Sequence, residues 1–257
     1  MDISKYKTVI FDCDGVILQS NKIKTNAFRS VLISEPDDLV DEFITYHQNN
    51  GGISRYIKFK HYYCNIKQEK QYLLMSKKAI SRYAKIILDQ LIEAQYVPGF
   101  VDTINYLNKN KIPCFVVSGG DQNELHNIFK RRKIFNKFIE VLGSPVSKGV
   151  HVKEIVKSNK LNYPAVFFGD ARSDMDAALN NGIDFCFISQ FSEWTDGRVL
   201  LDRYGCEIIN NFQELIKVAI DFDIGKLQIR GQKVEDIDIN WDEVQDILSN
   251  TIIDYCS

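Results

Sequence analysis

The chain has 257 residues, of which 45% are hydrophobic and 26% are charged, and these proportions exclude a fibrous or a disordered protein. Lysine and arginine together number 32 and aspartate and glutamate 34, so the net charge is −2. Such a balance provides no general attraction to nucleic acid or to an anionic membrane, and we expect neither as a partner.

The first predicted element is a short buried strand at residues 8–11. This β-branched and aromatic run stops at the polar sequence Asp-Cys-Asp-Gly of residues 12–15, as a strand does when it reaches a loop. From about residue 18 to residue 97 the apolar residues fall at helical spacing, with Lys, Gln and Tyr between them. We interpret residues 18–97 as an all-helical insert.

Beyond Pro98 and Gly99, strand-like and helix-like segments alternate. Helical spacing predicts helices between the strands and at 212–220, and apolar runs predict strands at 113–117, 138–142, 165–168, 185–188 and 207–209. Continuous apolar strands separated by helices are typical of a parallel sheet covered on both faces. The predicted fold class is therefore α/β, with a Rossmann-like core domain (residues 1–17 and 98–220) that carries the insert as a second domain.

Residues 221–257 are predicted to form a C-terminal extension. Apolar residues on either side of Arg230-Gly231-Gln232 are compatible with a small hairpin. Asn240 predicts the start of a helix with one apolar stripe, made of Trp241, Val244, Leu248, Ile252 and Tyr255. We expect the extension to pack on the main domain; as a dimerisation element it would instead make the protein a homo-oligomer.

Acids or a hydroxyl follow three of the predicted strands: Asp12 and Asp14, then Ser118, then Asp170 with Asp174. Because the carboxyl ends of parallel strands share one edge of a sheet, we expect these side chains to converge. Crowded carboxylates repel one another unless a cation lies among them. Oxygen ligands with no His or Cys nearby suit Mg²⁺, which the sequence therefore predicts.

An anion site is predicted beside these acids. Ser118-Gly119-Gly120 is expected to open a helix, whose N-terminal backbone N–H groups can approach an anion closely. Lys148, just before another predicted helix, would add positive charge. A carboxylate, Mg²⁺, a small hydroxyl residue and backbone donors are together what phosphoryl transfer requires.

These residues resemble the four ordered motifs of the haloacid dehalogenase-like hydrolase superfamily, over about residues 6–190. The motifs are Asp12-Cys13-Asp14-Gly15-Val16, Ser118, Lys148, and Gly169-Asp170-Ala171-Arg172-Ser173-Asp174. The helical insert is similar to the cap domain of the phosphoglycolate phosphatase and β-phosphoglucomutase branch.

The resemblance implies a role for each residue. Asp12 would be the nucleophile that attacks phosphorus, and Asp14 the general acid and then the general base. Mg²⁺ would be held by the Asp12 side chain, the Asp14 backbone carbonyl and Asp170, with Asp174 in or next to the coordination sphere. The phosphoryl oxygens would be held by Ser118, the Gly119 N–H and Lys148.

Two residues of the insert are candidates for substrate specificity. Arg55 and Lys58 lie three apart, so they share one face of a helix and could reach from the cap to a second anionic group of the substrate. For Lys58 the alternative is a solvated surface position.

The function expected from these features is a Mg²⁺-dependent phosphatase acting through an aspartyl-phosphate. Its substrate would be a small phosphorylated metabolite, such as a sugar, polyol or nucleotide-linked phosphomonoester. One alternative is a phosphomutase of the β-phosphoglucomutase type, and another is a non-catalytic binding protein on the same fold. The carboxylate of Asp14 argues against dehalogenase and phosphonatase chemistry, which needs no proton donor for an alkoxide.

The six cysteines are scattered, with no pair at metal-ligand or redox spacing, and we expect reduced thiols. No apolar run reaches the roughly 20 residues of a membrane span. The first residues lead into a strand and not into the apolar core of a signal peptide, so the cytoplasm is the expected location.

Overall fold

The computed structural model describes residues 1–195, 197–215, 228–229 and 232–233. Residues 1–216 form one compact unit and residues 217–257 a second. In the second unit, β7 (Gln228–Ile229) pairs antiparallel with β8 (Gln232–Lys233), where the sequence predicts a hairpin. The predicted C-terminal helix, and most of the helix predicted at 212–220, lie outside the described residues.

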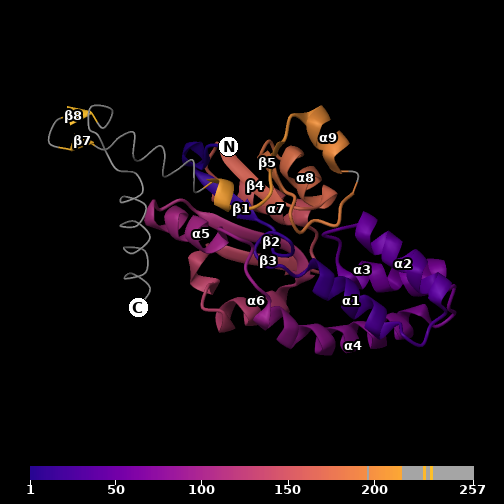
Figure 1. Ribbon diagram of the computed structural model, residues 1–257. Helices are drawn as coiled ribbons and strands as arrows, with labels where there is room; N and C mark the ends of the chain where they lie inside the picture. Colours follow the sequence, from indigo (N-terminus) through magenta and orange to yellow (C-terminus); the bar gives the residue numbers. More distant parts are fainter. Residues whose placement is uncertain (196, 216–227, 230–231, 234–257) are drawn as a thin grey trace, which may run out of the picture. The chain divides into compact units, whose positions relative to one another are not determined.

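A six-stranded parallel sheet forms the centre of the first unit (Figure 1). Its strand order is β3-β2-β1-β4-β5-β6, and every neighbouring pair is parallel. The predicted α/β class and parallel sheet are therefore confirmed. The strands are β1 (Thr8–Phe11), β2 (Cys114–Asp121), β3 (Glu140–Ser144), β4 (Ala165–Gly169), β5 (Asp184–Ile188) and β6 (Glu207–Ile209).

Both faces of this sheet are buried, and β1 shows why. Val9 and Phe11 belong to one hydrophobic cluster and Ile10 to another, because successive side chains of a strand point to opposite faces. The first cluster includes residues of α5 (Phe100–Lys109) and α6 (Gln122–Arg131). The second includes residues of α7 (Lys148–Lys157), α8 (Arg172–Leu179) and α9 (Gly197–Tyr204).

The segment between β1 and α5 is helical, as predicted, and lies at one end of the sheet (Figure 1). Its aromatic core includes Phe28, Phe43, Phe59 and Tyr83. The domain boundaries at residues 17 and 97 stay a prediction, since residues 1–216 form one compact unit. The segment contains α1 (Asn21–Val31), α2 (Asp37–Asn49), α3 (Arg55–His61), a π-helical turn (Tyr62–Ile66) and α4 (Tyr72–Glu93).

The prediction that Ser118-Gly119-Gly120 opens a helix is wrong. Strand β2 continues through these residues to Asp121, which pairs with Ser144 of β3. Helix α6 begins only at Gln122, because the Asp121 carboxylate caps it by accepting a hydrogen bond from the Glu124 backbone N–H. The glycines therefore present an extended backbone to the site and not a helix N-terminus.

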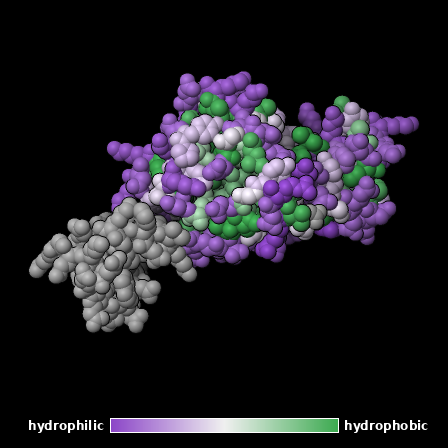
Figure 2. All heavy atoms as spheres, turned by 90° about the horizontal axis from the view of Figure 1, so that it is seen from above, coloured by the Kyte–Doolittle hydropathy of each residue, from purple (hydrophilic) through white to green (hydrophobic). Residues whose placement is uncertain are grey.

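Hydrophilic side chains predominate on the face of the first unit seen in Figure 2, with hydrophobic ones among them. Within the described residues, no helix is long and apolar enough to span a membrane.

Candidate active site

Three carboxylates meet at the carboxyl edge of the sheet. Asp12 directly follows β1, Asp170 directly follows β4, and Asp174 lies in the first turn of α8. One oxygen of each lies within 4.8 Å of the others, and all three side chains are buried. Parallel pairing of β1 with β4, with Phe11 beside Phe168, brings the ends of the two strands together. The sequence-predicted convergence of these three acids is therefore observed.

Lys148, the first residue of α7, lies against this group. Its Nζ is 3.0 Å from Asp12 Oδ1 and 2.5 Å from Asp174 Oδ1, and its side chain is buried. Burial alone would lower the pKa of Lys148, but the charges of Asp12 and Asp174 raise it overall, so the ammonium remains charged. One of the crowded negative charges is thus compensated within the chain.

Lys148 is the one lysine or arginine of the described residues that forms an ion pair with these three acids. Burial raises the pKa of Asp12 and, together with the charges of Asp12 and Asp174, that of Asp170. Burial also raises the pKa of Asp174 to about 7, against the lowering effect of Lys148. Asp12 Oδ1 is buried, and its ion-pair partner among the described residues is the ammonium of Lys148, 3.0 Å away. Three such carboxylates, with oxygen donors only, fit a small divalent cation such as Mg²⁺.

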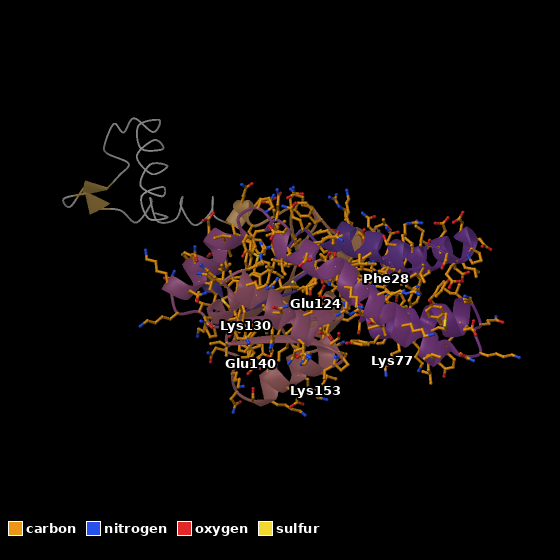
Figure 3. All side chains as sticks on the ribbon, turned by 90° about the horizontal axis from the view of Figure 1, so that it is seen from below. Phe28, Lys77, Glu124, Lys130, Glu140 and Lys153 are labelled. Carbon is orange, nitrogen blue, oxygen red and sulfur yellow. The ribbon has the colours of Figure 1, made fainter. Side chains whose placement is uncertain are left out.

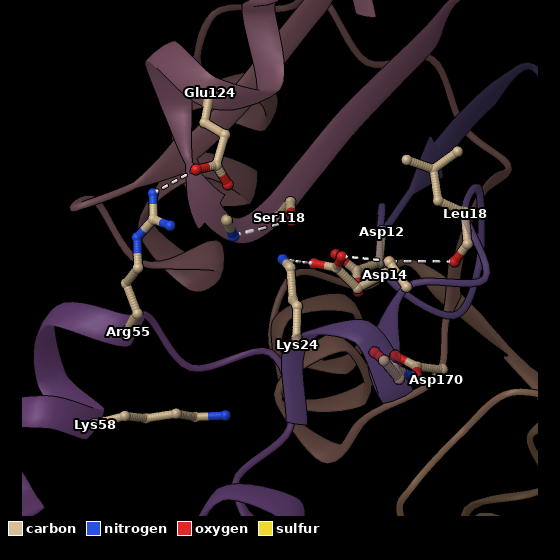
Figure 4. Close-up of polar contacts among 12 residues, drawn as sticks. Asp12, Asp14, Leu18, Lys24, Arg55, Lys58, Ser118, Glu124 and Asp170 are labelled. Atoms are coloured by element: carbon tan, nitrogen blue, oxygen red, sulfur yellow. Dashed lines mark hydrogen bonds and ion pairs between the residues drawn. The ribbon is translucent and has the colours of Figure 1, made fainter. Parts of the chain in front are cut away.

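The side chain of Asp14 belongs to a separate set of contacts. Its carboxylate accepts a 2.6 Å hydrogen bond from the Ser20 hydroxyl and forms an ion pair with Lys24 of α1 (Figure 4). Burial would raise the pKa of Asp14, but Lys24 and Ser20 lower it overall. Ser20 and Lys24 are four residues apart, so they share a helical face, a spacing that sequence reasoning had not used.

Ser118 and Gly119 occupy the end of β2 beside the acids. Ser118 is fully buried, and its hydroxyl accepts a 3.1 Å hydrogen bond from the Gly120 N–H. A Cβ at Gly119 would lie 2.0 Å from the carbonyl oxygen of Gly52 in the insert, so only glycine allows this approach. Gly119 and Gly120, but not Ser118, line the cavity above the acids.

That cavity, which we call the cap cavity, has a volume of about 60 Å³ and is bounded by the core and the insert. Asp12, Asp14 and Asp170 form part of its wall. Figure 3 shows Glu124 of α6 at the junction of the core with the insert and Phe28 within the insert. Further lining residues include Asn21, Lys24, His47, Arg55, Lys58, Tyr83 and Glu193.

Arg55 and Lys58 both reach the cap cavity from α3, but neither is solvated. Arg55 Nη2 is 2.9 Å from Glu124 Oε2, and its guanidinium lies over the Tyr83 ring. Lys58 Nζ donates to His47 Nδ1 at 2.6 Å and to the His47 carbonyl at 3.2 Å. The alternative of a solvated Lys58 is therefore wrong, because the insert folds over it. Contact of either residue with substrate stays a prediction.

Several residues of the site carry no motif and were not found from the sequence. His47 and Glu193 are examples: Thr25 of α1 lies between them, 2.9 Å from His47 Nε2 and 2.8 Å from Glu193 Oε2. Burial, followed by the charge of Lys58, lowers the pKa of His47 to about 2, so its ring is neutral. Asn21 is another, since its amide donates to Asp170.

Comparison with known proteins gives one family match. A family model described as haloacid dehalogenase-like hydrolase matches residues 9–188. No curated protein matches the sequence.

Solved structures share the fold at low sequence identity. A hydrolase from Pseudomonas syringae is 17% identical with a TM-score of 0.66, covering 84% of this chain and 98% of its own. A "predicted phosphoglycolate phosphatase" from Haemophilus somnus is 17% identical with a TM-score of 0.65, covering 84% and 99%. A β-phosphoglucomutase from Clostridium difficile is 16% identical with a TM-score of 0.63, covering 84% and 96%.

Proposed function

Because the chain belongs to the haloacid dehalogenase-like hydrolase family, we propose that it is a Mg²⁺-dependent phosphatase that acts through an aspartyl-phosphate on Asp12. Its substrate would be a small phosphorylated metabolite, such as a sugar, polyol or nucleotide-linked phosphomonoester. One observation carries the proposal: the buried Asp12 carboxylate lies beside the Lys148 ammonium and the acids Asp170 and Asp174. The proposed nucleophile, the ammonium that would contact the phosphoryl group and the proposed metal ligands therefore lie next to one another.

The metal ligands in this proposal are the side chains of Asp12, Asp170 and Asp174 and the backbone carbonyl of Asp14. When bound, Mg²⁺ would neutralise negative charge and polarise the phosphoryl group. Lys148 would then balance part of the remaining charge and contact a phosphoryl oxygen, with the Ser118 hydroxyl and the Gly119 N–H as further donors.

In the first step an Asp12 oxygen attacks phosphorus. The new bond joins this oxygen to phosphorus as the bond between phosphorus and the leaving oxygen breaks, and Asp14 gives that oxygen a proton. Lys24 and Ser20 favour the ionised form of Asp14 in the free protein. The negative charge of an incoming phosphate would raise the pKa of Asp14, which supports its protonation before this step.

In the second step water attacks the phosphorus of the aspartyl-phosphate. The ionised Asp14 takes a proton from this water, the bond between Asp12 and phosphorus breaks, and inorganic phosphate and the free carboxylate result. The contacts with Lys24 and Ser20 suit this base form of Asp14.

Phosphate release from a panel of phosphomonoesters, with and without Mg²⁺, tests the proposal. We expect release that requires Mg²⁺ and is lost in Asp12→Asn, while Asp102→Asn, an exposed change on α5, retains it. Isomer interconversion without phosphate release would indicate a phosphomutase instead. No turnover of any compound by the metal-loaded protein would contradict both and favour the binding protein.

A further inference from the structure

We infer that the leaving group of this phosphatase is a small, uncharged, hydroxyl-rich polyol or sugar and not a group with a second anion. The inference rests on the proposed function and deepens it. Its basis is the pairing of charges around the cap cavity, where carboxylates accompany the cations.

The first two cations of the cap cavity already have carboxylate partners. Lys24 forms an ion pair with Asp14, and Arg55 with Glu124. In the second pair both side chains are less than a tenth exposed, so water screens their attraction little. A second phosphate or carboxylate on the substrate would have to compete with Glu124 for Arg55.

The third basic residue of the cap cavity is Lys58, whose amine contacts His47 (Figure 4 shows the amine directed into the space beside Lys24). Glu193 also lines the cap cavity, held by the Thr25 hydroxyl. A second anion near Lys58 would therefore meet the carboxylate of Glu193, and one near Arg55 would meet that of Glu124, in a partly dry space where like charges repel strongly.

The wall of the cap cavity carries both hydrogen-bond donors and hydrogen-bond acceptors. Arg55 lines the cavity with a guanidinium that can only donate, and its buried Nε has no hydrogen-bond partner among the described residues. Glu193 and Glu124 can accept. A hydroxyl both donates and accepts, whereas a carboxylate or phosphate accepts only and an ammonium donates only. A polyol therefore satisfies both kinds of wall group at once.

The apolar part of the wall and the size of the cap cavity agree with this class. Phe28 and Tyr83 line the cavity and offer ring surface to C–H groups. A volume of about 60 Å³ holds a handful of water molecules. With the insert in this position, a short polyol chain suits the space better than a large ring system.

The test compares phosphomonoesters whose far ends differ in charge. Glycerol 3-phosphate and 3-phosphoglycerate share a three-carbon skeleton and end in a hydroxymethyl group or a carboxylate, and phosphoethanolamine ends in an ammonium. Glucose 6-phosphate and 6-phosphogluconate repeat the comparison at hexose size. We expect kcat/KM for the uncharged member to exceed that for each charged one by at least about tenfold.

Matched variants test whether the carboxylates of the cap cavity cause the preference for uncharged substrates. Glu193→Gln and, independently, Glu124→Gln remove a negative charge, so each should raise kcat/KM for 3-phosphoglycerate relative to glycerol 3-phosphate severalfold. Glu154→Gln, an exposed change on α7, should leave this ratio unchanged. Glu124→Gln also breaks a buried ion pair and could therefore disturb the fold. Glu193 is partly exposed, so Glu193→Gln provides the second, independent measurement.

Hydrolysis of para-nitrophenyl phosphate distinguishes a failure of this inference from a failure of the proposed function. If its hydrolysis depends on Asp12 but the wild-type protein prefers the anionic substrates, or neither Gln variant shifts the ratio, the inference is wrong and the phosphatase stands. If no phosphomonoester is hydrolysed, the proposed function and this inference fall together.

Discussion

The side-chain amide of Asn21, the first residue of α1, donates a 2.5 Å hydrogen bond to Asp170 Oδ2. The same amide donates to the Phe191 carbonyl at 2.8 Å. The first helix of the insert thus contacts one of the three clustered carboxylates directly, which links the position of the insert to the orientation of that carboxylate.

Asn21→Ala should weaken Mg²⁺ binding by about tenfold or more, because Asp170 loses the partner that orients it. Isothermal titration of the protein with Mg²⁺ measures this without reference to activity. Asn26→Ala, at an exposed position of the same helix, is the control and should bind as the wild type does. Equal affinities of all three proteins would show that Asn21 does not orient the ligand.

Arg55→Met should reduce the free energy of unfolding by about 3–5 kcal/mol, because it leaves the Glu124 carboxylate buried without its cation. Urea unfolding measures the loss. Arg29→Met breaks the exposed Arg29–Asp41 pair of the insert and should cost less than about 1 kcal/mol. Similar losses in the two variants would mean that burial of the Arg55 pair is unimportant.

Gly119→Ala should lower kcat/KM at least about tenfold for every substrate, because its Cβ would meet the Gly52 carbonyl and push the insert from the core. Circular dichroism should show retained helix and sheet. Gly149→Ala in α7 has open space around its Cβ and should add about 0.5–1 kcal/mol of stability with normal activity. Normal activity of Gly119→Ala would contradict this close approach.

Lys58 should make stability depend on pH. Burial, with the nearby Lys24 charge, lowers the pKa of Lys58 from 10.5 to about 7. Between these values the unfolded chain binds more protons than the folded one, so the contribution of Lys58 to stability increases with pH and is lost as the pH falls towards 7.

The measurement compares wild type with Lys58→Met in urea at pH 7.5 and 9.5. The free energy of unfolding of the wild type, relative to Lys58→Met, should rise by about 2–3 kcal/mol between these values. Lys60→Met, exposed on the same helix, should show no such difference. If the difference in the free energy of unfolding between wild type and Lys58→Met is the same at both pH values, the pKa of Lys58 is not lowered and the prediction is wrong.

The sheet and its acids could be predicted because their signals are local. Each strand is a continuous apolar run, and parallel order then places Asp12 and Asp170 at one edge. The extension of β2 through Gly119 could not be predicted, because it depends on pairing between Asp121 and Ser144, which are distant in sequence.

The insert side of the site was also beyond sequence reasoning. Arg55 meets Glu124, and Glu193 meets Thr25, only when the insert is placed against the core. Such contacts join residues far apart in the chain and leave no periodic pattern. Spacing gave the shared helical face of Arg55 and Lys58 but neither their burial nor their partners.

The most direct test of the account is the search for a phosphorylated Asp12. Asp14→Asn lacks the base of the second step, and para-nitrophenolate leaves without needing a proton, so the aspartyl-phosphate should accumulate. After an acid quench, mass spectrometry should find one added phosphoryl group on the Asp12 peptide, and none in the Asp12→Asn, Asp14→Asn double variant. A phosphoryl group on another residue, or none although the wild type releases phosphate, would contradict the central claim that Asp12 is the nucleophile.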